Sequence, residues 1–189
     1  MQFDDLSSYL AYYAAKGGPA LIPLETVAYD RGVTRTTAIR MLEDGRLTGG
    51  TIDGDRYATV DSYISLVHDE INRVDKVRRF IEGYAREGKI VTYEPVMEHV
   101  GLRWQSPPHR ALIGVILGKI STQSYVDHGI FLTAIVHRKY GSSTKPGKGY
   151  FGLVELITKK RPSGDEARAV EAQVKKVFDH YRAKAMKLR

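Results

Sequence analysis

Residues 24–59 have the sequence LETVAYDRGVTRTTAIRMLEDGRLTGGTIDGDRYAT, and this stretch decides the fold that we expect for the first part of the chain. Its apolar spacing predicts one short helix over residues 24–31 and a second over residues 35–44. Between them, Gly32 can adopt the left-handed backbone of a turn, and Thr34 is a good N-cap for the second helix. Two helices joined by a tight turn are therefore expected here.

The residues after the second helix predict a β-hairpin. Gly45 ends the helix, and residues 47–52 and 55–59 have the composition of two strands. The two residues between them, Asp53 and Gly54, are a favoured pair for a two-residue hairpin turn. The order of helix, turn, helix and hairpin is that of a winged helix.

The stretch from Leu21 to Tyr63 resembles the winged-helix DNA-binding domain of the excisionase and MerR type. The resemblance rests on the segments LETVA, GVTRTTAIRML, EDGRL and IDGDRY in this order, and it covers about 43 of the 189 residues. It implies that Ala38 and Leu42 belong to the core. It also implies that a recognition helix and a wing contact DNA through Thr34, Arg35, Thr36, Arg40 and Arg56. Modules of this kind serve regulators, excision factors and terminase subunits.

The residue types of the second helix suit a DNA groove. An Arg side chain can bridge two acceptors on a guanine edge or hold a phosphate, and a Thr side chain can bond to either while its methyl group contacts thymine. Arg35 and Arg40 are the leading candidates for such contacts. The alternative is that this surface binds protein or that the module has lost DNA binding, because the module is acidic.

Charge divides the chain into an acidic and a basic part. The 189 residues include 29 Lys and Arg against 22 Asp and Glu, a net charge of +7. Residues 1–75 hold 7 basic and 12 acidic side chains, for −5, whereas residues 76–189 hold 22 and 10, for +12. Such an excess attracts polyanions at long range, and we expect nucleic acid to be the partner. A generally basic, solvated surface is the alternative.

Helices are expected on both sides of the residues that resemble a winged helix. Apolar spacing predicts a short amphipathic helix over residues 3–15, ended by the Gly-Gly-Pro that follows. From Val60 to Tyr84, apolar residues recur every three or four positions. This pattern predicts one long helix or two in succession.

The basic part is expected to repeat the same plan. Residues 93–99 and 109–120 favour two helices, the second preceded by Ser-Pro-Pro, which suits a first turn. Residues 130–137 and 150–157 are rich in β-formers and predict two strands. Residues 138–149, a basic run of turn formers, would then be a second wing.

Two groups of polar residues in this module are candidates for DNA contacts. The first lies at the start of the helix over 109–120, where free N–H groups and the helix dipole favour phosphate. It consists of Arg103, Gln105, His109 and Arg110. The second lies in the basic loop, which could follow the DNA backbone or enter the minor groove. It consists of Arg138, Lys139, Lys145 and Lys148. A solvated loop is the alternative for the second group.

A helix with a basic end is expected to close the chain. The sequence Ser163-Gly164-Asp165-Glu166 is a capping box, and an apolar stripe follows it. The stripe consists of Val170, Val174, Val177 and Tyr181. It has two ways to become buried: it pairs two chains as a homodimer, or it folds back on its own module.

Composition excludes several classes of protein. Without Cys the chain has no disulfide framework, thiolate zinc site or cysteine nucleophile. No apolar run reaches the roughly 20 residues of a membrane-spanning helix, and the acidic start MQFDDLSSYL is unlike a signal peptide. We therefore expect a cytoplasmic location and no membrane partner. The GxGxxG match at residues 147–152 precedes a run of β-formers, so no nucleotide cofactor is expected. No other cofactor and no metal is expected either.

Two other functions remain as alternatives. A metal-dependent nuclease or phage-defence effector would need carboxylates that converge on a metal beside a basic group, and its candidates are Asp127, Glu155 and Lys159. Their spacing matches no catalytic signature. A protein-interaction adaptor is the other alternative, and it would show no salt-sensitive affinity for DNA.

We therefore expect a mainly α protein with small β-wings, an α+β fold of tandem winged-helix modules. Its parts would be an N-terminal helix and winged helix-turn-helix (1–66), a linker helix (67–88), a basic winged-helix-like module (89–160) and a basic C-terminal helix (161–189). The expected function is non-enzymatic, sequence-specific binding of double-stranded DNA. The protein would act as a transcription regulator, or as an excision or recombination accessory factor of a bacterium, phage or mobile element. A recombinase or another protein would then be a further partner.

Overall fold

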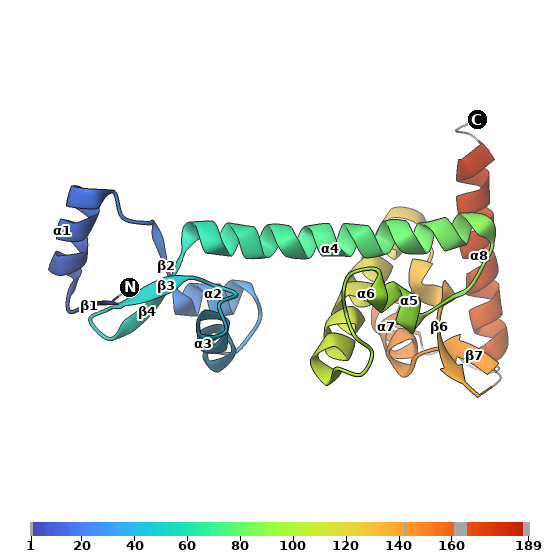
Figure 1. The fold of residues 1–189 in the computed structure, drawn as a ribbon. Helices are drawn as coiled ribbons and strands as arrows, with labels where there is room; N and C mark the ends of the chain where they lie inside the picture. Colours follow the sequence, from blue (N-terminus) through green and yellow to red (C-terminus); the bar gives the residue numbers. More distant parts are fainter. Residues whose placement is uncertain (1, 142, 161–165, 187–189) are drawn as a thin grey trace. The chain divides into compact units, whose positions relative to one another are not determined.

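The computed structural model describes residues 2–141, 143–160 and 166–186 (Figure 1). The chain divides into two compact units, which we call unit 1 (Met1–Ile71) and unit 2 (Asn72–Arg189). It is mainly helical with one small sheet in each unit, so the expected α+β class is confirmed. Within the described ranges, none of the helices combines the length and the apolar character needed to cross a membrane.

Unit 1 combines short helices with a four-stranded sheet. Its elements are, in order, β1 (Gln2–Phe3), α1 (Leu6–Lys16), β2 (Leu21–Pro23), α2 (Leu24–Asp30), α3 (Arg35–Glu43), β3 (Gly49–Ile52), β4 (Asp55–Thr59) and the first part of α4 (Val60–Glu87). The strands lie in the order β1-β3-β4-β2, with β4 antiparallel to both of its neighbours and β1 parallel to β3. The helices and the hairpin expected in this part of the sequence are present. Strands β1 and β2 were not expected, and Phe3, expected in the first helix, lies in β1.

Local side-chain chemistry sets the ends of these elements. The hydroxyl of Thr34 accepts a hydrogen bond from the backbone N–H of Thr37 at 3.2 Å, which caps α3 as expected. Asp53 and Gly54 have φ of 49° and 79°, the backbone of a type I′ turn. The short-range signals in the sequence therefore fix both the start of α3 and the β3–β4 hairpin.

The core of unit 1 lies between α2, α3 and the sheet. It consists of Leu24, Val27, Ala28, Ala38, Met41, Leu47 and Ala58. Ala38 is fully buried as expected, whereas Leu42 is half-buried and packs against the edge of this cluster. The opposite face of α3 leaves Arg35, Thr36 and Arg40 exposed. This helix is therefore held by one face and offers the other to solvent.

Unit 2 combines the second part of α4 with a three-stranded sheet and further helices. Its elements are β5 (Val91–Thr92), α5 (Tyr93–Glu98), α6 (Pro107–His128), the 3-10 turn η1 (Leu132–Ile135), β6 (Val136–Tyr140), β7 (Ser143–Pro146), α7 (Lys148–Thr158) and α8 (Glu166–Met186). The sheet order is β5-β6-β7, with β5 parallel and β7 antiparallel to β6. The helix expected over 109–120 is present but extends further, to His128.

Two segments expected as strands differ from the prediction. Residues 130–137 are all buried, but they form η1 and only the start of β6. Residues 150–157 form most of α7, a helix. The prediction was wrong because it weighed β propensity above spacing, and a short apolar run does not distinguish a strand from a buried helix. The residues of α7 that face the core recur at helical spacing, and they are Tyr150, Phe151, Val154 and Ile157.

The wing expected over residues 138–149 is shorter than predicted. The β6–β7 hairpin turns at Gly141, which has a φ of 61°, and Lys148 is the first residue of α7 instead of a loop residue. The GxGxxG segment therefore does open a helix after a strand, contrary to our expectation. That strand, β7, pairs antiparallel with β6, whereas a dinucleotide fingerprint belongs to a parallel βαβ unit.

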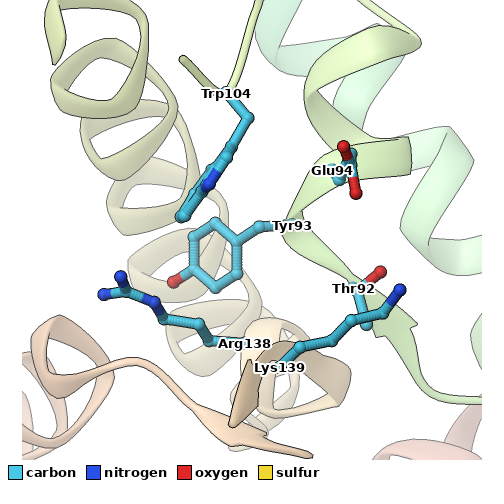
Figure 2. A pocket seen from close by; sticks show the side chains of 6 residues that line it. All are labelled: Thr92, Tyr93, Glu94, Trp104, Arg138 and Lys139. Carbon is cyan, nitrogen blue, oxygen red and sulfur yellow. The ribbon is translucent and has the colours of Figure 1, made fainter. Parts of the chain in front are cut away.

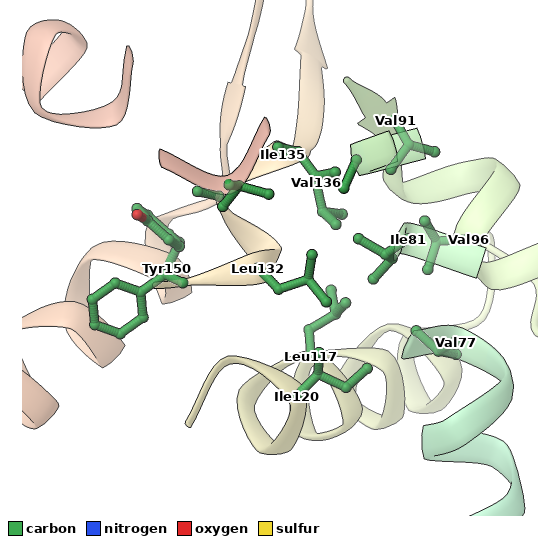
Figure 3. Packing of buried hydrophobic residues seen from close by; sticks show 14 of the residues in the cluster. Val77, Ile81, Val91, Val96, Leu117, Ile120, Leu132, Ile135, Val136 and Tyr150 are labelled. Atoms are coloured by element: carbon green, nitrogen blue, oxygen red, sulfur yellow. The ribbon is translucent and has the colours of Figure 1, made fainter. Parts of the chain in front are cut away.

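One hydrophobic core holds unit 2 together (Figure 3). The second part of α4 contributes three fully buried residues, Val77, Ile81 and Ala85. The C-terminal helix α8 contributes Val174, Val177 and Tyr181 to the same core, with Val170 packed at its edge. The apolar stripe thus folds back on its own module and is not available to pair two chains. Residues 163–165 of the expected capping box lie outside the described residues.

Candidate nucleic-acid interface

The side chains expected to read DNA in unit 1 lie on α3 or at its cap, and one of them is already paired. Nε of Arg35 donates to Oε1 of Glu25 on α2 at 2.6 Å, and both side chains are more than half exposed. The hydrogen bond from Arg35 lowers the pKa of Glu25 below its ordinary value. Thr34 uses its hydroxyl to cap the helix. Thr36 and Arg40 are exposed, and in the described part of the chain the Arg40 side chain has no ion pair.

Ion pairs also engage other arginines near α3. Nη1 of Arg56 on β4 lies 3.3 Å from Oε1 of Glu43 at the end of α3. Nη2 of Arg46 lies 2.7 Å from Oδ2 of Asp44. Exposed pairs of this kind contribute about 0–1 kcal/mol each. A DNA phosphate can therefore displace these carboxylates, but the surface is less cationic than its arginines suggest.

Unit 2 brings two candidate arginines onto one tryptophan. The guanidinium of Arg110 on α6 lies 5.8 Å from the centroid of the Trp104 ring, and that of Arg138 on β6 lies 5.4 Å from it. The ring centroid of Tyr93 lies 6.1 Å from that of the same tryptophan, and Figure 2 shows the three side chains gathered together. Trp104, Tyr93 and Arg138 border a cavity of about 230 Å³, which we call the Trp104 pocket. It is lined by Thr92, Tyr93, Glu94, Trp104, Arg138 and Lys139.

Backbone register and one hydrogen bond explain how distant residues meet at this pocket. The parallel pairing of β5 with β6 sets Thr92 opposite His137, so Tyr93 comes beside Arg138. On the other side, Nη1 of Arg110 donates to the carbonyl oxygen of Trp104 at 2.8 Å, which ties the loop before α6 to the helix. The pocket is therefore a product of the fold and not of one sequence segment.

The start of α6 presents a further donor. The backbone N–H of Arg103 donates to Nδ1 of His109 at 2.9 Å. An imidazole that accepts at Nδ1 carries its proton on Nε2 when neutral, so the ring keeps an N–H group for an outside acceptor. Gln105 is exposed in the same loop. The four candidates of this group lie near the capped end of α6, but the first turn of this helix has no free backbone N–H: Pro107 and Pro108 have none, and those of His109 and Arg110 donate to Ser106. A phosphate here would therefore depend on the side chains.

A buried histidine supports the β6–β7 hairpin. A carbonyl oxygen can only accept, so Nε2 of His137 donates to the carbonyl of Ala134, at 3.1 Å. Its Nδ1 then accepts from the hydroxyl of Thr144, also at 3.1 Å. Burial lowers the pKa of His137 below its ordinary value. The neutral ring therefore joins η1, β6 and β7, and Arg138 is the next residue on that strand.

The remaining candidates lie away from the Trp104 pocket. Lys145 is the register partner of Arg138 but borders a second cavity, of about 400 Å³, beside His137, Phe151 and Val170. Lys148 is exposed at the start of α7. Sequence reasoning missed Tyr93 and Trp104 altogether. A signal was present, because the only Trp of the chain lies between two candidates, Arg103 and Gln105.

Asp127 and Glu155, the carboxylates considered for a metal site, do not form one in the described part of the chain. In the ranges that the structure describes, no three His, Asp or Glu side chains gather closely enough to hold a metal ion. Asp127 accepts a hydrogen bond from Gln123 at 2.8 Å, and Glu155 is exposed on α7.

Comparisons of the chain with protein-family models, curated proteins and solved structures give no match. Its function therefore has to be inferred from its own side chains. The two arginines on Trp104 are the most specific arrangement among them.

Proposed function

We propose that this chain is a non-enzymatic, sequence-specific double-stranded DNA-binding protein built from two winged-helix modules. The observation that carries the proposal is the convergence of Arg110 and Arg138 on Trp104, with Lys139 next to Arg138 on β6. Both arginines are exposed, and an arginine that lies over an aromatic ring keeps its positive charge. A guanidinium matches the oxygens of a phosphate backbone in charge and geometry.

The positive net charge of unit 2 supports a role for this unit in binding the DNA backbone. Residues 72–189 include 23 Lys and Arg against 11 Asp and Glu, a net charge of +12. Each phosphate neutralised by a basic side chain releases counterions, so most of the affinity from this unit should depend on salt. We assign the larger part of the electrostatic affinity to unit 2.

We assign sequence selection to α3 of unit 1. The order of β2, α2, α3 and the β3–β4 hairpin supports a winged helix, and Arg35, Thr36 and Arg40 are exposed on α3. Residues 1–71 have a net charge of −5, from 6 basic and 11 acidic side chains. Unit 1 should therefore add little affinity and most of the discrimination between base pairs. A transcription regulator, or an excision or recombination accessory factor, fits this division.

A binding titration with the full chain over a series of salt concentrations tests the proposal. A random duplex pool would first identify a preferred sequence, and anisotropy would then follow binding to that duplex and to a scrambled one. Arg110→Gln with Arg138→Gln should weaken binding to both duplexes about equally, by roughly tenfold or more, and flatten the salt dependence. Arg35→Ala with Arg40→Ala should instead reduce the ratio between the two duplexes. Lys76→Gln, an exposed residue of α4, is the control.

Three results would contradict these roles. The first is an absence of duplex binding at low salt, which would favour the protein-interaction adaptor. The second is an unchanged sequence preference in the Arg35 and Arg40 double variant. The third is DNA cleavage with Mg²⁺ or Mn²⁺ that disappears in Asp127→Ala or Glu155→Ala, which would favour the nuclease.

A further inference from the structure

We propose that the Trp104 pocket binds one unpaired nucleotide, with its base against the Tyr93 and Trp104 rings and its phosphate on Arg138. The inference rests on the proposed DNA binding. It adds a ligand, an unpaired nucleotide, that binding along an intact duplex does not involve. The ligand chemistry is a planar base joined to a phosphate. A free nucleotide has this chemistry, and so does an unpaired nucleotide at the end of a DNA strand.

The rings favour an unpaired base over a paired one. Tyr93 and Trp104 are both half-buried, and their planes are inclined at 58° with centroids 6.1 Å apart. A base can stack on an aromatic side chain only through its flat face. In a duplex the neighbouring bases cover that face and leave the edges in the grooves. Two rings that line a pocket therefore cannot stack on a base inside an intact duplex. They can stack on a base that has left the duplex.

The size and the charges of the pocket fit the same ligand. Its volume of about 230 Å³ is small, enough for one base with part of its sugar and phosphate and not for a stretch of strand. Arg138 and Lys139 are consecutive on β6 and both exposed, and Figure 2 shows the Arg138 guanidinium beside Tyr93 and the Lys139 amine on the opposite side, beside Thr92. Arg138 is therefore the cation that a phosphate would meet beside the two rings. The planar guanidinium of Arg138 can also stack on a base, as arginines do in single-strand recognition.

One acidic residue gives the pocket a basis for choosing among bases. Among the described residues that line it, Glu94 is the only carboxylate. A carboxylate accepts hydrogen bonds from exocyclic amino groups, which adenine, cytosine and guanine carry and thymine lacks. We therefore infer that the pocket prefers a base with an amino group over thymine.

The single tryptophan makes the test direct, because all intrinsic tryptophan fluorescence comes from Trp104. The full chain would be titrated with dGMP, dCMP, dAMP and TMP. It would also be titrated with a blunt duplex and with the same duplex extended by one unpaired nucleotide. Saturable quenching is expected from the amino-bearing nucleotides, the extended duplex or both, with TMP roughly tenfold weaker.

Variants separate the pocket from general charge. Arg138→Gln should weaken the quenching by about tenfold, and Glu94→Gln should retain it while reducing the preference over TMP. Lys76→Gln removes one exposed charge from α4 and should leave the titration unchanged.

The results also distinguish this inference from the proposed function. Quenching by the extended duplex alone supports the pocket and assigns it to DNA ends, whereas quenching by free nucleotides alone supports it as an effector site. Equal changes with blunt and extended duplexes, and none with free nucleotides, would overturn the inference. So would constant fluorescence while anisotropy still reports duplex binding, and then the proposed function stands. Nucleotide quenching without any duplex binding would keep the pocket and overturn the proposed function.

Discussion

Glu25 and Arg35 form an ion pair between α2 and α3, with Oε1 of Glu25 accepting from Nε of Arg35 at 2.6 Å. The carboxylate lies where an acceptor on DNA would have to lie in order to use the same donor. In the free protein, Glu25 therefore balances the charge of Arg35. Arg35 lies on α3, the helix to which we assign sequence selection. Both side chains are exposed, so the pair is weak enough for another acceptor to replace.

Replacement of Glu25 should strengthen DNA binding. Glu25→Gln frees the Arg35 guanidinium and removes a negative charge, so duplex affinity should rise by up to about fivefold, the equivalent of about 1 kcal/mol. Anisotropy at fixed salt would measure the change. Asp69→Asn, at an exposed position of α4, removes the same charge far from the pair in sequence and is the control. An equal gain in both variants would show that only net charge matters.

Two glycines should respond to alanine in opposite directions. A Cβ at Gly49 would lie 1.9 Å from the carbonyl oxygen of Tyr57 on β4, so Gly49→Ala has to displace backbone and should lower the free energy of unfolding by about 1–3 kcal/mol. At Gly83, near the C-terminal end of α4, no described atom outside the neighbouring helix backbone lies within 4 Å of the added Cβ. Gly83→Ala should therefore raise the free energy by up to about 1 kcal/mol. Urea unfolding followed by circular dichroism checks both signs.

A buried hydroxyl pair offers a test of packing in unit 2. The side-chain oxygens of Ser121 on α6 and Thr133 in η1 lie 2.7 Å apart and are both buried. Thr133→Val keeps the shape but leaves the Ser121 hydroxyl without this partner, which should cost about 1–3 kcal/mol. Adding Ser121→Ala should recover part of that loss. Single variants that simply add in a double-mutant cycle would show that the two hydroxyls are not coupled.

The burial of His137 predicts that unit 2 loses stability in mild acid. Its folded pKa lies below the ordinary value of 6.5, so the unfolded chain takes up the proton more readily. The stabilisation from the neutral ring is complete above pH 6.5 and is lost as the pH falls from there toward the folded pKa. The slope reaches at most about 1.4 kcal/mol per pH unit. Urea titrations from about pH 7.5 to about pH 5.5 would measure it.

The matched variant for this test is His137→Gln, which has no titrating ring. Its unfolding free energy should be lower at neutral pH but should depend less on pH than that of the native chain. Identical pH slopes in the two proteins would assign the acid sensitivity to other groups.

Unit 1 could be predicted from sequence because its signals are local. The Thr34 cap and the Asp53-Gly54 turn act within a few residues, and both are found where expected. In unit 2 the same approach failed over residues 150–157, because valine, phenylalanine and tyrosine favour strands by propensity but here follow the spacing of a helix. Tertiary burial overrode the local preference.

The candidate site shows the same limit. Arg110 and Arg138 are identifiable from sequence as basic residues near a helix start and in a hairpin. Their meeting at Trp104 depends on the register of β5 with β6, which no local pattern encodes. The ion pair of Arg35 depends on the packing of α2 against α3 in the same way. Contacts between elements, which local sequence patterns do not predict, therefore determine the geometry of the candidate site.

The buried segment from Ile130 to Val136 has a consequence for the behaviour of the protein when it unfolds. Its sequence, IFLTAIV, contains no charge and no proline, and in the folded chain all of it is buried through η1 and the start of β6. Segments of this type form cross-β aggregates once they are exposed. Heating the protein beyond the unfolding of unit 2 should therefore end in aggregation. Its lifetime at high temperature would then be governed by the rate of unfolding and not by an equilibrium.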